Sequence, residues 1–255
     1  LLYSYINSYF NAGLKSPLDD AILRFRHIDI DSYRKIDEIP FDFLRKRISV
    51  IVLSGNHRIL VAKGAPEEIL RVCSSRDQDG VVGPLTDEGK EQVNTIYTNQ
   101  SREGFRTLAV CYRILADDQQ QFSIDDEKDM ILVGLVTFID PPKESARESV
   151  RLLNHSGIEL KILTGDNELV TKKTCELIGL DVKGVLTGAE IEHMDEETLS
   201  RQVKNVTIFS RVTPVQKNRI MLALKHNGHV VGFMGDGIND APPIRQADVG
   251  ISVEN

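Results

Sequence analysis

Apolar runs, polar loops and segments of helical spacing alternate regularly in the second half of the chain. Three short and almost entirely apolar runs are predicted to be strands, at 160–163, 206–209 and 229–234. Helices are predicted at 168–178, at 214–228 and between Asp140-Pro141-Pro142 and Ser156-Gly157. Apolar strands that alternate with helices are typical of a parallel sheet covered on both faces. This half is therefore predicted to be a doubly wound α/β domain.

Single residues mark the ends of two of these helices. Asn167 precedes the helix at 168–178 and Gly179 follows it, which is the usual order of an N-cap and a left-handed C-cap. Thr213 precedes Pro214, and a proline at the first helical position favours a helix start there. Local side-chain chemistry thus predicts both ends of the first helix and the start of the second.

The first half has a looser pattern, in which strand-like runs lie next to one another. These runs are at 48–54, 58–62 and 107–112, and Asn56 between the first two indicates a hairpin turn. Helices are predicted at 19–25, after Ala65-Pro66 and at 87–100, and the acidic stretch 117–129 is predicted to be a surface loop. Hairpins with separate helices indicate an antiparallel α+β domain.

Composition and charge narrow the classes of function. Hydrophobic residues make up 41% and charged residues 27% of the 255 residues, as in ordinary globular proteins. The net charge of −7 and the lack of a basic face argue against nucleic acid as a partner. The three cysteines form no C-x-x-C pair, so reduced, buried thiols are predicted. No apolar stretch approaches the ~20 residues of a membrane-spanning helix. Because the chain starts without methionine and stops in strand-like sequence, we expect a piece of a longer protein.

Polar residues follow the carboxyl ends of the predicted parallel strands, where ligands bind in sheets of this kind. They are Asp140, Thr164-Gly165-Asp166, Ser210-Arg211 and the stretch from Gly235-Asp236 to Asp240, with Lys217 on the following helix. Carboxylate oxygens suit Mg²⁺, and a lysine or a helix N-terminus suits phosphoryl oxygens. Each segment alone would be an ordinary turn or cap. Four of them at one sheet edge indicate phosphoryl transfer.

Five motifs, in one order, carry a resemblance to a known family. They are KGAPE (63–67), DPPK (140–143), ILTGDN (162–167), FSRVTPVQK (209–217) and MGDGINDAP (234–242). The chain resembles the P-type (E1-E2) cation-transporting ATPases. GLKSPLDDAIL (13–23), KIDEIPFDF (35–43) and GHVVGFMGDGINDAP (228–242) are most similar to the bacterial magnesium-transporting pumps.

The resemblance implies a nucleotide-binding domain at residues 1–136, built on an antiparallel sheet. It also implies a haloacid-dehalogenase-like (Rossmannoid) parallel α/β phosphorylation domain at 137–255. The family's phosphorylated aspartate lies in an Asp-Lys-Thr-Gly-Thr motif, and no aspartate here is followed by Lys-Thr-Gly. The second domain is therefore expected to be incomplete and to lack the strand that carries this aspartate. ATP and Mg²⁺ are the implied cofactors.

The implied whole protein is an ATP-driven cation pump that transports magnesium through an aspartyl-phosphate intermediate. Its implied location is the cytoplasmic face of the cell membrane, with the pump's membrane helices and actuator domain as partners. The fragment alone is expected to be inactive as an ATPase, because the attacking aspartate lies outside it.

The resemblance also assigns roles to single residues. In the phosphorylation domain, Asp236 would bind Mg²⁺ with support from Asp240, Lys217 would neutralise the phosphoryl group, and Thr164, Gly165 and Asn239 would contact it. Asp140 and Asp166 would lie at the hinge and near the nucleotide phosphates. In the nucleotide-binding domain, Phe43 would stack on adenine, and Lys63 and Gly64 would line the adenine pocket. Asp19 would face the adenine, and Arg106 would reach the phosphates. Arg47 occupies the place of a further basic residue.

The missing strand leads to a geometric prediction. In the resembling fold it lies between the strand leading to Thr164 and the strand leading to Gly235. We therefore expect these two neighbours to be separated by about two strand spacings, roughly 9–10 Å. Residues 1–10 are the only nearby segment with strand-like residues, but their position in the family assigns them to the first half.

Other interpretations remain open. A calcium- or proton-type pump of the same family shares these motifs. A free-standing dehalogenase-type phosphatase would need a D-x-D pair after an apolar strand near the N-terminus, and none is there. A nucleotide-sensing module would have no use for Thr164, Lys217 and Asp236 together. Thr187-Gly188-Ala189-Glu190 is similar to the T-G-E loop of these pumps, but its position predicts a connector.

Overall fold

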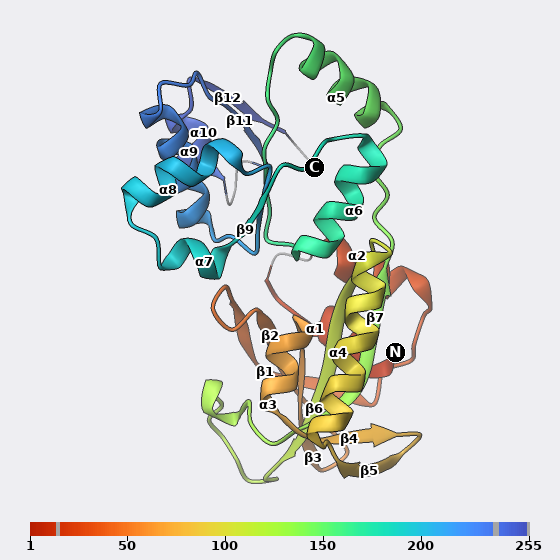
Figure 1. The fold of residues 1–255 in the computed structure, drawn as a ribbon. Coiled ribbons are helices and arrows are strands. Elements are labelled where there is room, and N and C mark those ends of the chain that lie inside the picture. The colour runs from red at the N-terminus through yellow and green to blue at the C-terminus, as the bar shows by residue number, and fades with distance from the viewer. Residues whose placement is uncertain (14–15, 237–239, 254–255) are drawn as a thin grey trace. The chain divides into compact units, whose positions relative to one another are not determined.

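The computed structural model describes residues 1–13, 16–236 and 240–253. Internal contacts divide the chain into two compact units (Figure 1). Unit 1 consists of Leu1–Gln100 and Phe105–Ile139, and unit 2 of Ser101–Gly104 and Asp140–Asn255. Among the described helices, none has the length and apolar character needed to cross a bilayer.

Unit 1 is built on a seven-stranded sheet in the order β1-β2-β3-β6-β7-β4-β5. Its strands are β1 (Tyr33–Asp42), β2 (Arg47–Ser54), β3 (His57–Gly64), β4 (Cys73–Gln78), β5 (Val81–Pro84), β6 (Arg106–Leu115) and β7 (Met130–Phe138). Neighbouring strands are antiparallel except β4 and β7, which are parallel. The predicted hairpin is confirmed, because Ser54 pairs with His57 across the turn at 55–56. The mostly antiparallel fold class of this half is thereby confirmed.

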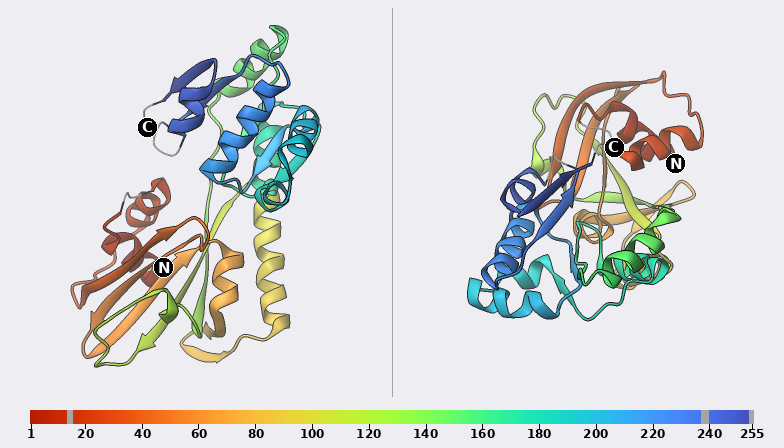
Figure 2. Two further views of the ribbon diagram at one scale, coloured as in Figure 1. Left: turned by 90° about the vertical axis from the view of Figure 1, so that its left-hand side faces the viewer. Right: turned by 90° about the horizontal axis from the view of Figure 1, so that it is seen from above.

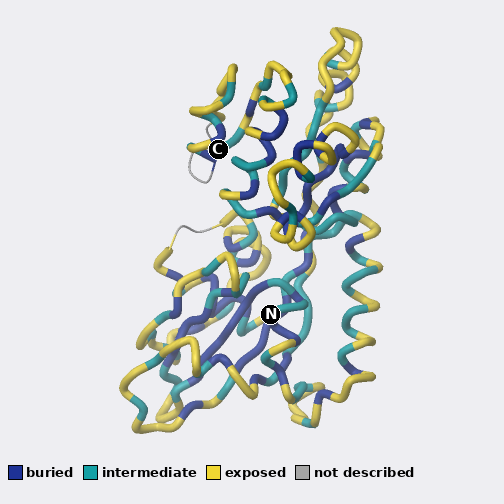
Figure 3. The backbone as a smooth tube through the Cα atoms, turned by 60° about the vertical axis from the view of Figure 1, so that its left-hand side comes forward, coloured by how far each residue is buried: buried dark blue, intermediate teal, exposed yellow. Residues whose placement is uncertain are grey.

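Helices cover both faces of this sheet (Figure 2). They are α1 (Leu2–Phe10), α2 (Pro17–Phe25), α3 (Pro66–Val72) and α4 (Asp87–Arg102), with a short 3₁₀ turn η1 (Ile124–Asp126). Residues alternate between the two cores as the pleat requires. In β2, Val50 and Val52 pack with α1 and α2, whereas Ile51 packs with α3. The central strands are accordingly the most buried part of the unit (Figure 3).

Within its described residues, unit 2 contains two separate parallel sheets. One has the order β8-β10-β9, and the other consists of β11 and β12. The strands are β8 (Ile162–Leu163), β9 (Val185–Thr187), β10 (Ile208–Ser210), β11 (Gly232–Gly235) and β12 (Val249–Ser252). The helices are α5 (Ser145–His155), α6 (Glu168–Ile178), α7 (Gly188–Glu192), α8 (Glu196–Gln202), the 3₁₀ turn η2 (Val203–Asn205), α9 (Pro214–His226) and α10 (Ala241–Gln246).

The pairings of β8 and of β11 within the described residues are compatible with the predicted gap, whose width stays a prediction. β8 pairs with β10 alone and β11 pairs with β12 alone, so no backbone ladder joins β8 to β11 there. The predicted caps are confirmed. The Asn167 side chain accepts hydrogen bonds from Leu169 and Val170, and Gly179 is left-handed. Thr213 and Gln216 form a capping box at the start of α9.

The N-terminal segment differs from its strand-like composition. It forms helix α1, in which Asn7 Nδ2 donates hydrogen bonds to the backbone carbonyls of Ile48 and Val61 at 3.1 and 2.9 Å. These long-range bonds and the burial of Ile6 hold the helix on the sheet. Strand propensity is a weak, context-dependent preference, and here tertiary contacts outweigh it.

Candidate functional site

The residues predicted to bind nucleotide in unit 1 lie at one edge of its sheet. Register places Asp42 opposite Arg47, Arg47 opposite Gly64, and Gly64 opposite Ala109. The turn at 43–46, the end of β3 and the start of β6 therefore meet at the same edge. Phe43 lies in this turn, Lys63 and Gly64 end β3, and Arg106 begins β6, so all four lie at the same edge of the sheet.

Lys63 and Asp19 form a buried ion pair at this edge. Lys63 Nζ donates to Asp19 Oδ1 and, at 2.5 Å, to Ser8 Oγ. Asp19 Oδ2 also accepts from the backbone and hydroxyl of Ser16 at 3.0 and 2.7 Å, which caps α2. Burial alone would raise the pKa of Asp19. The charge of Lys63 and the hydrogen bonds from Lys63 and Ser16 outweigh burial, so the pKa of Asp19 is lowered.

Two exposed aromatic rings lie at the end of β1 and in the turn that follows it. Phe43 is 50% exposed and Phe41 is 52% exposed, and their rings meet edge to face with centroids 5.3 Å apart. Sequence reasoning selected Phe43 and passed over Phe41. The signal was present in the spacing Phe-Asp-Phe, because side chains two residues apart in extended chain share a face. Exposed aromatic rings of this kind are suited to stacking on a flat base.

Gly64 supports the same turn from the neighbouring strand. A Cβ atom on Gly64 would lie 2.4 Å from the Lys46 carbonyl oxygen and 2.5 Å from the Cβ of Arg47. Only glycine permits this approach. Lys46 itself has a positive φ of 47°, and its carbonyl accepts from Ala65 N at 3.0 Å. Lys63 thus supplies a buried cation, and the backbone of Gly64 packs against the aromatic turn.

Arg47 has an internal partner. Its Nε donates to Glu127 Oε2 at 2.7 Å, and the guanidinium is almost fully buried. Glu127 belongs to the stretch 117–129 that was predicted to be a surface loop. The prediction is wrong for this residue, whose side chain is buried because two arginines neutralise it.

In unit 2, the loops after β8 and β10 are tied together by their backbones. Arg211 N donates to Asp166 O at 2.9 Å, and Val212 N donates to Thr164 O at 3.1 Å. Within the first loop, Thr164 Oγ1 accepts from Asp166 N at 3.1 Å and lies 3.2 Å from Asp166 Oδ2. Arg211 has a positive φ of 54°. A non-glycine residue in this conformation is often found where a loop is shaped for function.

Lys217 and Asp240 form an ion pair in unit 2. Thr213 caps α9 and so places Lys217 in the first turn of that helix. Lys217 Nζ donates to Asp240 Oδ1 at 2.8 Å, and both side chains are mostly buried. Asp240 packs against Gly235, where an added Cβ would lie 2.5 Å from Asp240 Oδ2. The close fit requires a glycine at the end of β11.

The remaining predicted residues have the following positions. Asp236 is exposed directly after β11, and Asp140 is exposed between β7 and α5. Gly165 lies exposed in the loop with Thr164 and Asp166. Asn239 lies outside the described residues. Among the described residues, no group of three or more histidine, cysteine or acidic side chains could hold a metal ion.

The Thr187-Gly188-Ala189-Glu190 segment has a structural role. Thr187 and Glu190 form a capping box that starts α7, as a connector requires. Gly188 approaches so closely that an added Cβ would lie 2.3 Å from the Arg211 carbonyl oxygen. Gln216 Nε2 also donates to Gly188 O at 2.8 Å. The connector therefore supports the loop between β10 and α9.

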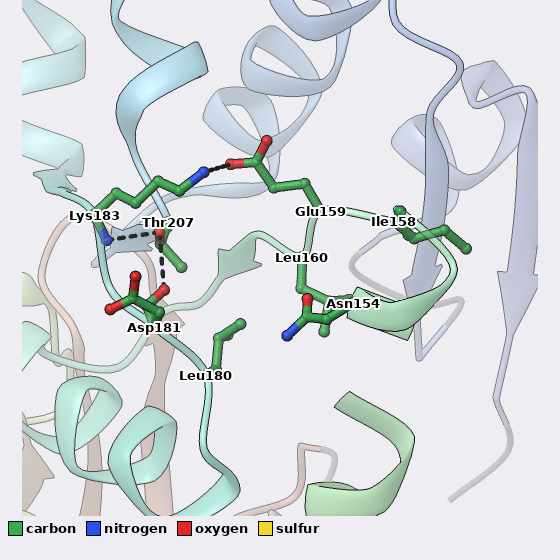
Figure 4. A pocket seen from close by; sticks show the side chains of 9 residues that line it. Asn154, Ile158, Glu159, Leu160, Leu180, Asp181, Lys183 and Thr207 are labelled. Atoms are coloured by element: carbon green, nitrogen blue, oxygen red, sulfur yellow. Dashed lines mark hydrogen bonds and ion pairs between the residues drawn. The ribbon is translucent and has the colours of Figure 1, made fainter. Parts of the chain in front are cut away.

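A shallow cavity of about 240 Å³ lies at the opposite, amino ends of β8, β9 and β10 (Figure 4). Figure 4 shows Glu159 and Lys183 joined across its rim, at 3.1 Å. Its lining consists of Asn154, Gly157, Ile158, Glu159, Leu160, Leu180, Asp181, Lys183 and Thr207. None of the predicted site residues lines it.

Comparison with known proteins gives a consistent family. Residues 15–145 match the family model described as "P-type ATPase, cytoplasmic domain N". The chain is 44% identical over 257 residues to "Magnesium-transporting ATPase, P-type 1" of Escherichia coli (strain K12), covering 98% of the chain and 29% of that protein. It is 42% identical over 265 residues to a protein of the same name from Salmonella typhimurium, covering 100% of the chain and 29% of that protein.

A more distant relative has a different printed name. The chain is 34% identical over 225 residues to "Calcium-transporting ATPase" of Bacillus subtilis (strain 168), covering 87% of the chain and 25% of that protein. The chain thus spans less than a third of the length of each of these curated relatives.

Proposed function

The chain belongs to the P-type ATPases, and we propose that it is the ATP-binding and phosphoryl-transfer portion of a magnesium-transporting pump. One observation carries the first part of this proposal. An exposed aromatic pair, Phe41 and Phe43, lies at the same sheet edge as the buried Lys63–Asp19 pair. Flat rings and a fixed pair of opposite charges are complementary to a nucleobase with its donor and acceptor groups.

Different residues of unit 1 are proposed to bind different parts of ATP. The ring of Phe43, with Phe41 against it, offers a stacking surface for adenine. Asp19 and Lys63 offer a hydrogen-bond acceptor and a hydrogen-bond donor at this edge of the sheet, and Gly64 allows the backbone of β3 to lie close to the turn. Arg106, at the start of β6, supplies charge for the phosphates. Arg47 contributes indirectly by holding the turn at 43–46, because its guanidinium is bonded to Glu127.

Unit 2 is proposed to be an incomplete phosphorylation domain of the dehalogenase-like type. Lys217 carries the positive charge for the phosphoryl oxygens, and Thr164 and Gly165 supply hydroxyl and amide donors beside it. The proposal includes Asn239 as a further contact. Asp140 and Asp166 are proposed to lie near the hinge and the nucleotide phosphates.

The donor set fits a magnesium ion. Asp236 is an exposed carboxylate directly after β11, and Asp240 follows four positions later in the sequence. Mg²⁺ keeps several waters and takes one or two protein carboxylates, so a larger acidic cluster is not required. Asp236 would hold the ion with support from Asp240, and the bound ion would neutralise charge on the phosphates.

The attacking group is proposed to lie elsewhere in the pump, on a strand between β8 and β11. Its carboxylate would form a bond to the terminal phosphorus of ATP as the bond to ADP breaks, leaving an aspartyl phosphate. Membrane helices and an actuator domain of the same pump are the proposed partners. We place the chain on the cytoplasmic face of the membrane. Magnesium is favoured over calcium because the relatives named for magnesium share more of the sequence over more of the chain.

An NMR titration of ATP into the ¹⁵N-labelled chain tests the first part. Amides of residues 43–46, Lys63 and Gly64 should shift, and Phe43→Ala should weaken binding by about 1–3 kcal/mol, the usual value of one stacked base. Phe25→Ala is the matched control, because Phe25 is an exposed ring outside the predicted edge. Shifts confined to α4 would contradict the proposed site.

Phosphorylation of the longer pump tests the second part. The pump should form an acid-stable, hydroxylamine-sensitive phosphoenzyme, whereas the present chain should form none. Asp236→Ala in the pump should lower its level on the order of 10²–10³-fold, as when a transition-state stabilising group is removed. Asp181→Asn, an exposed carboxylate at the opposite sheet edge, should leave it unchanged. A phosphoenzyme formed by the chain itself would contradict the proposal.

A further inference from the structure

A fully buried carboxylate lies behind the aromatic turn of unit 1. The side chain of Glu127 has 0% exposure and accepts hydrogen bonds from three residues. Arg45 Nη1 donates to both of its oxygens at 2.8 Å. Arg47 Nε donates at 2.7 Å and Ser49 Oγ at 2.6 Å. A buried charge with this many partners is strongly held, because each bond replaces one that water would make.

All three partners of Glu127 belong to one stretch of chain. Arg45 lies in the turn itself, and Arg47 and Ser49 lie at the start of β2. Glu127 comes from the connection between β6 and β7, about eighty residues away in sequence. The carboxylate therefore links the turn to a distant part of the same unit.

The same bonds determine the course of the turn that carries the two rings. Arg45 Nη2 donates to Pro40 O at 2.6 Å, on the strand that leads to Phe41. Asp42 Oδ1, just before Phe43, accepts from the amides of Leu44 and Arg45, just after it, at 2.8 Å each. Arg45 thus connects Glu127 to both ends of the segment 40–45. Without Glu127, the Arg45 guanidinium would keep its bond to Pro40 O but lose its link to the connection between β6 and β7.

We propose that Glu127 is a positioning residue for nucleotide binding, which holds the aromatic turn in its binding conformation through Arg45 and Arg47. The inference rests on the proposed stacking of adenine at Phe41 and Phe43. A turn that is already ordered loses little conformational entropy when ligand binds, so anchoring it raises affinity without any contact to the ligand. Glu127 lies beneath the turn and needs no contact of its own.

The test is a double-mutant cycle on ATP affinity, measured by titration calorimetry with the whole chain. Glu127→Gln keeps the size of the side chain but turns an amide group toward guanidinium donors. We expect it to weaken ATP binding about tenfold, the ratio that corresponds to about 1.4 kcal/mol. In a chain that also carries Phe41→Ala and Phe43→Ala, the same change should alter affinity by less than about twofold, because the rings that the turn positions are gone.

Two further variants accompany Glu127→Gln. Arg45→Gln leaves Glu127 paired with Arg47 and Ser49, so it should fold even where Glu127→Gln does not, and it should weaken ATP binding in the same ring-dependent way. Asp125→Asn is the matched control, since Asp125 is an exposed carboxylate two residues away. It should leave affinity unchanged. Circular dichroism shows that each variant is folded at the temperature of the titration.

The outcomes separate this inference from the proposed function. Wild-type affinity in both Glu127→Gln and Arg45→Gln overturns the role of Glu127. An equal loss with and without the two rings also overturns it, since the carboxylate would then act elsewhere. A wild-type chain that does not bind ATP overturns the proposed function itself.

Discussion

The two units differ in how far their apolar strand residues are buried and in how their charged side chains are paired. In unit 1, a continuous sheet has helices on both faces, and Leu60, Val61 and Ala62 of its central strand are fully buried. In the described residues of unit 2, five strands form two separate sheets. Strand β11 leaves Met234 65% exposed, and its partner β12 leaves Val249 53% exposed. Apolar strand residues are normally covered, so β11 and β12 differ from the strands of unit 1 in exposing apolar side chains.

The charged residues show the same contrast. Glu127 and the Lys63–Asp19 pair of unit 1 have protein partners and are shielded from water. In unit 2, Lys217 is paired with Asp240, but Asp236 is exposed. In unit 1 the buried charges are held by protein partners, whereas the Asp236 carboxylate of unit 2 is accessible to solvent.

The sharpest test of this contrast is amide hydrogen exchange. Amides of β3, which has paired strands on both sides, should exchange only when unit 1 unfolds. Amides of β11, which has β12 as its partner, should exchange through local opening at much lower cost. We expect rates that differ by roughly 10³-fold or more, which corresponds to about 4 kcal/mol. Mass spectrometry of peptic fragments measures this, and equal protection of β3 and β11 would refute the contrast.

Breaking the buried pair of unit 1 should have the next largest effect. Lys63→Met leaves the Asp19 carboxylate buried without its cation, which typically costs about 3–5 kcal/mol of unfolding free energy. The double variant Lys63→Met with Asp19→Asn removes both charges and should recover much of that loss. Urea denaturation measures both. A loss that is the same in the single and the double variant would show that the pair is not coupled.

The glycine behind the aromatic turn provides a smaller effect with an internal control. Gly64→Ala would place a methyl group against the backbone of Lys46, and such overpacking costs about 1–3 kcal/mol. Gly83→Ala, in edge strand β5, has no atom within 4 Å of the added Cβ and should leave stability nearly unchanged. Thermal denaturation of the two variants compares them. Equal melting temperatures would mean that the turn yields to the methyl group.

Acid should affect unit 1 through Asp19, with the smallest effect of the four. The pKa of Asp19 is lowered in the folded chain because the Lys63 charge and its hydrogen bonds outweigh burial. Its contribution to stability is therefore complete above the ordinary aspartate pKa of about 4 and is lost as pH falls through the lower folded value. The stability difference between wild type and Asp19→Asn should shrink as pH falls below about 4. Urea titrations at several pH values measure this stability difference. A difference that grows as pH falls would contradict the prediction.

Much of the local structure follows from single residues and their neighbours in sequence. Asn167, Gly179, Thr213 and Pro214 predicted the ends of two helices, and the structure has them there. Such signals are readable because a cap is a hydrogen bond between residues two or three positions apart. The hairpin between β2 and β3 was predicted for the same reason. The candidate residues of the sheet edges were also named in advance, apart from Phe41 and Glu127.

Other features depend on residues that meet only in the folded chain. Segment 2–10 became a helix because Asn7 bonds to two strands more than forty residues away. The polar strand β4, with the sequence CSSRDQ, is paired on both sides by β5 and β7 and has no apolar pattern to predict it.

Glu127 is the clearest case of the difference. By sequence it is one acidic residue in a stretch of them, and its burial depends on two arginines about eighty residues earlier. The sequence by itself determined both ends of α6, the start of α9 and which chemical groups the candidate site contains, because these follow from short-range bonds and residue type. The tertiary structure alone decided which charges are paired and buried, because desolvation and ion pairing depend on the distances between residues that are remote along the chain.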